Sequence, residues 1–299
     1  MIREVFAWIG LMLLRAIAKL PLSAVRRIGG LAGDLAWRLA RERRRVALTN
    51  LRLCFPDWSE ARRNEVARRH FRCFMSSFFE RFIVWFEPTA RVRALVEVRG
   101  LEHYEPYRGK PTIFLAPHFV GLDAGGVRLQ MEVGGASMYA NQKSKVLTRA
   151  MTRGRSRVEG VRMLLRNEGL RPAIRLIREG VPFYFLPDMD LGRRDAIFVP
   201  FFGVEAATVV SVARLAQMTG AAVIPFVTRM SETGYVAQTY PAWTDFPGED
   251  LAAATRRMNA FIEQRVLEMP EQYLWTHKRF KTRPPGEPGV YGAPRGDQR

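Results

Sequence analysis

The spacing of hydrophobic positions divides the chain into a helical first third and a mixed remainder. Residues 2–90 are predicted to be mostly helical, and the segment 59–86 has the clearest helical spacing. Its apolar positions are Val66, Phe71, Phe74, Phe78, Phe82 and Trp85. Ser59 is a candidate N-cap for this helix, and Pro88 is expected to close it.

From about Val96 the pattern changes to short apolar runs that are bounded by Gly and Pro and alternate with helical stretches. The runs cover residues 112–116, 137–140, 182–186, 223–227 and 235–239. The helix candidates cover residues 122–131, 146–153, 170–178, 206–218 and 250–268. This alternation predicts an α/β fold with a central, mostly parallel sheet flanked by helices.

The same pattern suggests four regions. We expect an N-terminal membrane anchor helix over 1–22, a helical membrane-proximal region over 23–90 and an α/β core over 91–281. The last segment, 282–299, is rich in Pro, Gly and charged residues and is predicted to be irregular.

The N-terminus favours association with a membrane. Residues 5–14 are uninterrupted apolar residues, too few for a bare transmembrane helix of ~20. The wider stretch 5–22 approaches that length if Arg15 and Lys19 extend toward the lipid headgroups. Four arginines follow within residues 41–45, and apolar residues beside basic ones are typical of an anionic membrane surface. A spanning helix, a helix that lies flat and a core helix with a solvated basic end all stay open.

Composition adds a large positive charge and few cysteines. With 47 Lys+Arg against 29 Asp+Glu, the net charge is +18, which suits nucleic acid, anionic lipid or a phosphorylated substrate. The arginines are spread along helices and no nucleic-acid module is recognisable, so no nucleic-acid partner is expected. A non-enzymatic basic binding protein stays as an alternative class. Cys54 and Cys73 lack metal-ligand spacing and predict reduced thiols.

The sharpest candidate for chemistry is the segment PTIFLAPHFVGLDAGG, where His118 directly follows an apolar strand and Pro117. Ligands bind at the carboxyl ends of strands in α/β sheets, so this placement suits a catalytic residue. Asp123 lies five positions later and can meet His118 if the histidine sits in the turn and Asp123 in the first helical turn after Gly121. The helix dipole also favours an ionised carboxylate there.

This pair predicts a general base. A carboxylate bonded to one imidazole nitrogen fixes the tautomer, and the other nitrogen then takes a proton from an attacking hydroxyl. A thioester donor needs no covalent enzyme intermediate, and the sequence has neither a G-x-S-x-G elbow nor a cysteine beside a histidine.

At these residues the chain resembles a known family. H-x4-D/E after a strand is the signature of glycerolipid acyltransferases, and the wider context is similar to bacterial lipid A biosynthesis acyltransferases of the lauroyl/myristoyl type. The resemblance covers nearly all of the chain from Phe6 to about Tyr291. It includes HFVGLDAGG (118–126), Met138-Tyr139 followed by Asn141, GRSR (154–157), LPDMD (186–190), FVPFFGVEAAT (198–208), AVIPFV (222–227) and PEQYLWTHKRFKTRP (270–284).

The resemblance implies transfer of a fatty acyl chain from an acyl carrier protein thioester to a hydroxyl of a phosphorylated lipid A precursor, with no metal or other cofactor. It implies an inner-membrane enzyme on the cytoplasmic face, held by a single N-terminal anchor among anionic lipids. By the same resemblance His118 is the base and Asp123 its partner. A lysophospholipid or lyso-ornithine lipid acceptor is the alternative.

Further candidates concern substrate binding. Asn141 is carried over from the resemblance, although this chain has ANQKSK where family members commonly carry Arg or His. Arg155 and Arg157 offer guanidinium groups for a phosphate, with a solvated or lipid-facing basic patch as the alternative. Asp188 and Asp190 follow a strand and either bind a cation or hold arginines, and we favour the second because no third ligand is evident.

Two groups of residues have competing structural interpretations. Residues 198–203 line an acyl groove or belong to the core, and Thr208 is expected to help satisfy the start of the helix over 206–218. His277 is interpreted as structural or exposed, and His70 and His103 as incidental.

Overall fold

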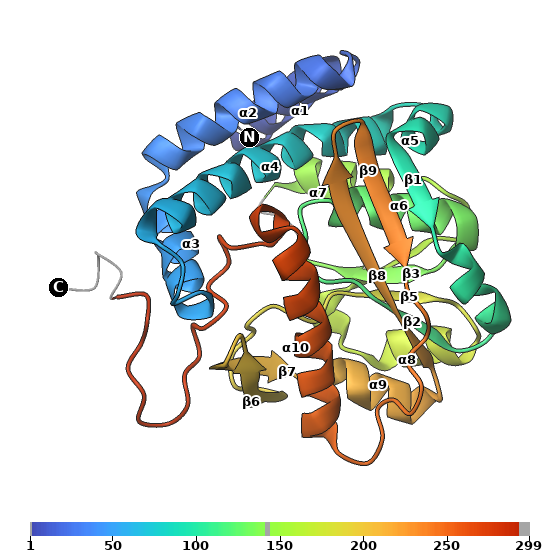
Figure 1. Ribbon diagram of the computed structural model, residues 1–299. Coiled ribbons are helices and arrows are strands. Elements are labelled where there is room, and N and C mark those ends of the chain that lie inside the picture. Colours follow the sequence, from blue (N-terminus) through green and yellow to red (C-terminus); the bar gives the residue numbers. More distant parts are fainter. Residues whose placement is uncertain (1, 141–143, 293–299) are drawn as a thin grey trace.

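The computed structural model describes residues 2–140 and 144–292 (Figure 1). Five helices come first: α1 (Ile2–Ala18), α2 (Leu22–Leu39), α3 (Arg41–Cys54), α4 (Glu60–Phe86) and α5 (Thr89–Leu95). They confirm the predicted helical first third. In Figure 1, α1 and α2 lie together above α4 at one end of the molecule.

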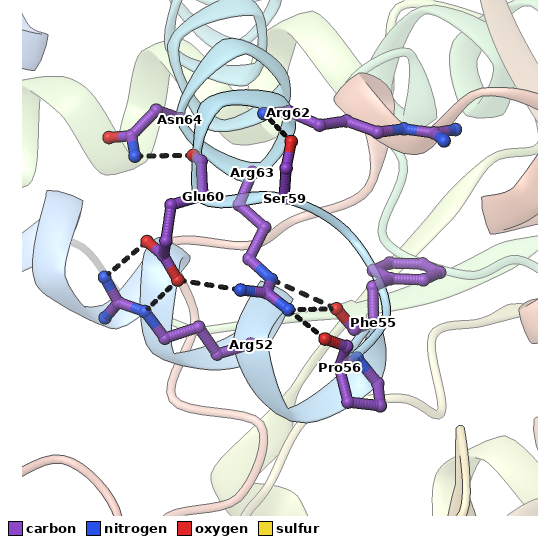
Figure 2. Close-up of polar contacts among 8 residues, drawn as sticks. All are labelled: Arg52, Phe55, Pro56, Ser59, Glu60, Arg62, Arg63 and Asn64. Carbon is purple, nitrogen blue, oxygen red and sulfur yellow. Dashed lines mark hydrogen bonds and ion pairs between the residues drawn. The ribbon is translucent and has the colours of Figure 1, made fainter.

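The corner between α3 and α4 is held by a buried arginine (Figure 2). The guanidinium of Arg63 donates to the carbonyl of Phe55 from Nε at 3.0 Å and from Nη2 at 2.8 Å, and pairs with Glu60 at 2.7 Å. The Glu60 carboxylate also accepts hydrogen bonds from Nε and Nη2 of Arg52, at 3.0 and 2.9 Å. The predicted N-cap is confirmed, because the Ser59 hydroxyl accepts the N–H of Arg62 at 3.2 Å. These bonds satisfy the backbone groups that the sharp turn exposes.

Helix α2 packs against α4 through two glycines. A Cβ at Gly29 would lie 2.5 Å from the Cα of Ser76, and a Cβ at Gly33 would lie 2.6 Å from the Cα of Arg72. Two helix backbones approach this closely only where one of them has no side chain. The Gly29–Gly33 spacing therefore fixes where α2 crosses α4.

A seven-stranded sheet follows, in the order β1-β9-β8-β2-β5-β3-β4. The strands are β1 (Val96–Arg99), β2 (Thr112–Leu115), β3 (Ala136–Tyr139), β4 (Arg162–Leu165), β5 (Phe183–Phe185), β8 (Ala222–Ser231) and β9 (Gly234–Thr239). Among these pairs only β8 and β9 are antiparallel in the described residues, so the predicted mostly parallel sheet is confirmed.

Helices cover both faces of the sheet: α6 (Leu122–Val133), α7 (Lys145–Arg155), α8 (Arg171–Arg178), α9 (Ser211–Thr219) and α10 (Leu251–Glu268). Successive side chains of β2 enter opposite cores. Ile113 and Leu115 belong to one buried cluster with α8, α9 and α10, whereas Phe114 belongs to the other, with α6. A strand that is buried on both faces explains the uninterrupted apolar run seen in the sequence.

The prediction of a helix over 206–218 is partly wrong. Residues 196–209 form an antiparallel hairpin of β6 (Ala196–Phe201) and β7 (Val204–Val209), and α9 begins only at Ser211. Phe202 and Gly203 form its two-residue turn with φ of 51° and 76°, as the tightest hairpin turns require. Thr208 lies in β7 and does not start a helix. Its hydroxyl accepts a hydrogen bond from Nη2 of Arg279 at 2.7 Å.

The N-terminal anchor and the tail are described only in part. No helix within 2–140 and 144–292 combines the length and the apolar character needed to cross a membrane, and this includes α1 in the predicted anchor segment 1–22. Residues 282–292, at the start of the predicted irregular tail, form turns and bends.

The contact between α2 and α4 generates a stability prediction. Gly33→Ala places a methyl group against the backbone of α4, and we expect the free energy of unfolding to fall by about 2 kcal/mol, the cost of overpacking. For a domain of this size the melting temperature falls by about 5 °C, which calorimetry measures.

The matched control is Gly30→Ala in the same helix. Its Cβ would meet only the flexible end of the Arg72 side chain, at 3.0 Å. We expect no loss, or a small gain from the better helix propensity of alanine. Equal losses in the two variants would contradict the packing argument.

Candidate active site

A cavity of about 1190 Å³ opens at the carboxyl ends of the parallel strands. One part of its wall is apolar and comes from helices α1, α4, α6 and α7, namely Ala7, Leu11, Leu14, Phe78, Phe82, Trp85, Leu122, Val127, Leu147 and Met151. The lining also includes His118, Asp123 and four arginines, at positions 81, 155, 166 and 194. An apolar wall with a few convergent polar groups is typical of a ligand site.

His118 and Asp188 are brought together by the register of two neighbouring strands. β2 and β5 pair in parallel with Leu115 opposite Phe185, and Ala116 continues the ladder by donating to the carbonyl of Phe185 at 2.9 Å. Each strand then continues through one residue and a proline, so His118 and Asp188 each lie three positions beyond the matched pair. Equal lengths of chain from paired strand ends place the two side chains at the same edge of the sheet.

Asp188 binds both the ring and the backbone of His118. Its Oδ1 lies 2.6 Å from Nδ1 of the imidazole, and its Oδ2 accepts the His118 N–H at 3.0 Å. Burial by itself raises the pKa of Asp188, but the His118 charge and these two hydrogen bonds outweigh it and hold the pKa below its ordinary value. The carboxylate is therefore ionised, and the Nδ1 tautomer that donates to it is favoured.

Residues 272–274 fix the loop from the other side. Val120 donates to the carbonyl of Gln272 at 2.9 Å, and Leu274 donates to the carbonyl of His118 at 3.0 Å. The Tyr273 ring packs against Phe119. The backbone of His118 is thus bonded through both its N–H and its C=O, which fixes the position from which the ring faces the cavity.

Asp123 lies in the first turn of α6, as predicted, but its bonds go to arginines. Its Oδ1 receives Nε of Arg155 at 2.7 Å, and its Oδ2 lies 2.7 Å from Nε of Arg81 on α4. The second contact is a close ion pair that lacks hydrogen-bond alignment. Burial raises the pKa of Asp123, but the charges of Arg155 and Arg81 outweigh it and keep the pKa below the ordinary value.

The structure therefore corrects the expected partnership of His118. The ring nitrogen Nδ1 is bonded to Asp188, and Asp123 is held by two arginines on the wall of the same cavity. A signal for Asp188 was present in the sequence, because APH (116–118) and LPD (186–188) repeat one residue, a proline and a polar group after an apolar strand. Local spacing cannot show that these two strands are neighbours.

Arg155 and Arg157 are both engaged within the protein. Arg155 ends α7, which approaches α4 so closely that a Cβ at Gly154 would lie 2.3 Å from the Trp85 ring. Arg157 donates to the backbone carbonyls of Val84 and Glu87 at the end of α4. The sequence led us to expect either a phosphate site or an exposed basic patch at this segment. The observed contacts are instead bonds within the protein.

Among residues 2–140 and 144–292, no arginine forms an ion pair or hydrogen bond with Asp188 or Asp190, contrary to our preferred interpretation. Within the described residues, Asp190 accepts the N–H of Thr282 at 2.6 Å and of Gly192 at 3.0 Å. Its own N–H donates to Nε2 of His277 at 2.9 Å. Burial lowers the pKa of His277 to about 4, so this histidine is a neutral acceptor. This contact gives His277 a structural partner, as the interpretation of a structural histidine expects.

The remaining candidates contribute to the core or lie outside the described residues. His70 is fully buried, and its Nδ1 lies 3.2 Å from the carbonyl of Glu271. Phe201 and Phe202 pack in the core, and the cavity lining does not include them. Cys54 and Cys73 are free thiols. Asn141 lies outside the described residues.

Helix α1 closes one side of the cavity. Its Ala7, Gly10, Leu11 and Leu14 line the cavity. Glu4, in its first turn, accepts the hydroxyl of Ser144 at 2.7 Å and the N–H of Val146 at 3.1 Å, at the start of α7. A carboxylate at a helix N-terminus stabilises that end of the helix. The first turn of the chain is thereby tied to the helix that bears Arg155.

Comparison with known proteins identifies the chain as an acyltransferase and gives its family. Residues 1–282 match the model of the bacterial lipid A biosynthesis acyltransferases, and the chain belongs to that family.

Two Escherichia coli relatives illustrate the match. The chain is 32% identical to the lipid A biosynthesis lauroyltransferase over 95% of this chain and 94% of that protein. It is 33% identical to the lipid A biosynthesis myristoyltransferase over 94% of this chain and 88% of that protein. It also aligns with the crystal structure of the 1-acyl-sn-glycerophosphate acyltransferase from Thermotoga maritima, at 14% identity and a TM-score of 0.41, over 83% of this chain and 99% of that one.

The ion pair of Asp123 generates a prediction with a defined pH dependence. Arg155→Ala leaves a buried carboxylate with Arg81 alone, and we expect the free energy of unfolding to fall by about 3 kcal/mol. Without Arg155, burial raises the pKa of Asp123, and a carboxyl with a raised native pKa stabilises the fold only when protonated. The deficit should therefore be smaller at pH 5 than at pH 8 in urea unfolding.

The control is Arg153→Ala, an exposed arginine of the same helix, which should change stability by less than about 0.5 kcal/mol. Adding Asp123→Asn to Arg155→Ala should recover part of the loss, because the buried carboxylate charge is then removed and the charge that remains, on Arg81, is partly exposed to water. A loss that is independent of pH and not recovered would show that the pair is not the source.

Proposed function

We propose that the protein transfers a fatty acyl chain from an acyl carrier protein thioester to a hydroxyl of a phosphorylated lipid A precursor, with His118 as the general base. The observation that carries this proposal is the buried His118–Asp188 pair at the edge of a large cavity with an apolar wall. Membership of the lipid A acyltransferase family supports the class of acceptor.

His118 is suited to take a proton from the acceptor. Its Nδ1 is occupied by Asp188, and the ring lines the cavity, so Nε2 is the nitrogen that a hydroxyl would approach. As the hydroxyl oxygen bonds to the thioester carbonyl carbon, its proton moves to Nε2. The tetrahedral intermediate then breaks its C–S bond, and the carrier thiolate receives that proton from the imidazolium as the ester forms.

Asp188 has the orienting role in this mechanism. Its ionised carboxylate stabilises the imidazolium and fixes the ring through Nδ1, as in other histidine–carboxylate pairs. The bond to the His118 N–H fixes the backbone as well. The two contacts together leave the imidazole little freedom to turn away from a bound hydroxyl.

Asp123 has a different role in the proposal, on the substrate side of the site. Asp123 lines the cavity together with His118, so its charge lies beside the proposed acceptor site. Arg81 and Arg155 keep the carboxylate ionised and in place.

The apolar part of the cavity suits the acyl chain. About 1190 Å³ lies above the range of typical small-molecule sites, which leaves room for an acyl chain together with part of the acceptor. The aromatic wall from α4 excludes water from the thioester and strengthens the electrostatic contacts of the nearby polar groups.

The experiment is a transfer assay with purified protein, a panel of acyl carrier protein thioesters and a tetra-acyl lipid A precursor, read by mass spectrometry. His118→Ala should lower kcat by at least about 10³-fold because the base is lost. Asp188→Asn should lower kcat by roughly 10²- to 10⁴-fold, because an amide cannot stabilise the imidazolium and favours the wrong tautomer.

His103→Gln is the control and should keep full activity, because the cavity lining does not include this histidine. If Asp123→Asn abolished transfer while Asp188→Asn kept near-normal kcat, the roles given to the two carboxylates would be reversed. Transfer to lysophospholipids but not to the lipid A precursor would reject the acceptor.

We further propose that α1 and α2 hold the protein on an inner membrane, on its cytoplasmic face, among anionic lipids. The outward side of α1 exposes Val5, Phe6, Trp8, Ile9, Met12 and Leu13. On α2, Leu31, Leu35 and Leu39 are 71%, 56% and 71% exposed at a spacing of four residues, so they form one stripe. Exposed apolar groups beside the exposed arginines 41, 43 and 45 suit a lipid interface.

The α2 stripe can be tested apart from α1. Changing Leu31, Leu35 and Leu39 to Ser should lower the partition coefficient onto vesicles with anionic phospholipid by at least about tenfold, since apolar burial drives insertion. Co-sedimentation measures it. The matched control changes Leu267 and Met218 to Ser, which are 60% and 52% exposed on α10 and α9. Equal losses in both proteins would reject a role for the stripe.

A further inference from the structure

We propose that Arg166 and Arg194 form a phosphate-binding site at the rim of the active-site cavity. The inference rests on the proposed function, because it assigns the part of the site that recognises a phosphate on one of the two substrates. Both arginines line the same cavity as His118.

Elimination among the four cavity arginines points to these two, because Arg81 and Arg155 are committed to the buried carboxylate of Asp123. Arg166 is exposed, and its side chain makes no hydrogen bond or ion pair within the described residues. A cation that faces a substrate cavity without such a partner is available to a ligand.

Arg194 is nearly as free. Its side chain is 96% exposed, and its contact with Asp195 is a loose ion pair of 3.8 Å. The carboxylate of Asp195 also lines the cavity and is shared with Arg214 at 3.2 Å. Asp195 therefore has a second cation, and Arg194 can turn to an anion without leaving that carboxylate unpaired.

The fold places this rim at a useful distance from the base. Arg166 is the first residue after β4, whereas His118 follows β2, and β5 and β3 lie between those strands. Three strand spacings of roughly 4.8 Å separate β2 from β4 by about 14 Å. A phosphate at the rim and a reacting hydroxyl at His118 thus belong to different parts of an extended ligand.

The local backbone adds positive potential. Ser211 begins α9 and also lines the cavity, so the N-terminal end of that helix faces the same space. The free N–H groups of a first helical turn favour an anion. With two guanidinium groups nearby, the rim is suited to the charge and the planar oxygen pairs of a phosphate.

The phosphate has two possible sources in the proposed reaction. One is the phosphomonoester of the glucosamine lipid acceptor, and the other is the phosphodiester in the phosphopantetheine arm of the carrier. Both present the same chemistry to the arginines. The experiment therefore varies the two substrates independently.

Steady-state transfer is measured for the wild type, Arg166→Ala, Arg194→Ala and the double variant. The acceptors are a phosphorylated lipid A precursor and its phosphatase-treated form. The donors are the acyl carrier protein thioester and an acyl-N-acetylcysteamine thioester, which has no phosphate. Arg171→Ala is the control, because it removes an exposed arginine of α8 that the cavity lining does not include.

If the acceptor supplies the phosphate, each single variant should raise the KM for the phosphorylated acceptor about tenfold, the loss expected for one charge-assisted hydrogen bond, with kcat little changed. With the dephosphorylated acceptor the wild type should show the KM rise of the double variant, because both contacts are lost, and the double variant should show no further rise. If the carrier supplies the phosphate, the variants should instead raise the KM for the acyl carrier protein thioester, and they should match the wild type with the phosphate-free donor. Arg171→Ala should match the wild type throughout.

Variants that match the wild type on every substrate pair, or that lose no more than Arg171→Ala, would overturn the site. Failure of the proposed function is distinguishable, because the wild type would then transfer acyl groups to no acceptor. In that case equilibrium binding of the phosphorylated and dephosphorylated glycolipids to His118→Ala protein still tests the arginines. A preference for the phosphorylated lipid that vanishes in the double variant supports them, and equal binding of the two lipids rejects them.

Discussion

The parallel pairing of β2 with β5 is the constraint on which the site depends. It sets Leu115 opposite Phe185, and the equal spacing beyond that pair delivers His118 and Asp188 to within 2.6 Å of each other. Both strands are buried on two faces, so a shift of one residue would turn every side chain to the wrong core. The packing of the sheet therefore fixes the register of β2 and β5, and this register sets the distance between His118 and Asp188.

The second theme is how the fold handles charge in a buried site. Asp123 is balanced by Arg81 and Arg155, which come from α4 and α7, and these helices meet at Gly154 because no other residue fits against Trp85 there. The buried arginines are thus matched to a carboxylate or to backbone carbonyls, whereas the less engaged ones lie at the rim. Arg81 and Arg155 therefore maintain the structure of the site, whereas Arg166 and Arg194 are available to bind a ligand.

Helix α1 has apolar residues on both of its sides, and the structure gives each side a different neighbour. One side lines the cavity through Leu11 and Leu14, and the other exposes residues such as Phe6 and Leu13. A helix that is apolar all round is usually buried on every side. Here the second side is open, which makes α1 the boundary between the cavity and the proposed lipid surface.

The sequence by itself determined the helical first third, the mostly parallel α/β core, the placement of His118 and Asp123 at a strand end and a helix start, and the family. These features depend on local periodicity, on caps such as Ser59 and on residues that are close along the chain. Only the tertiary structure decided that Asp188 is the partner of His118, that Arg155 and Arg157 are engaged internally, and that residues 196–209 form a hairpin. Strand order and helix crossing bring together residues such as His118 and Asp188, which are 70 positions apart, and no local pattern encodes which strands become neighbours.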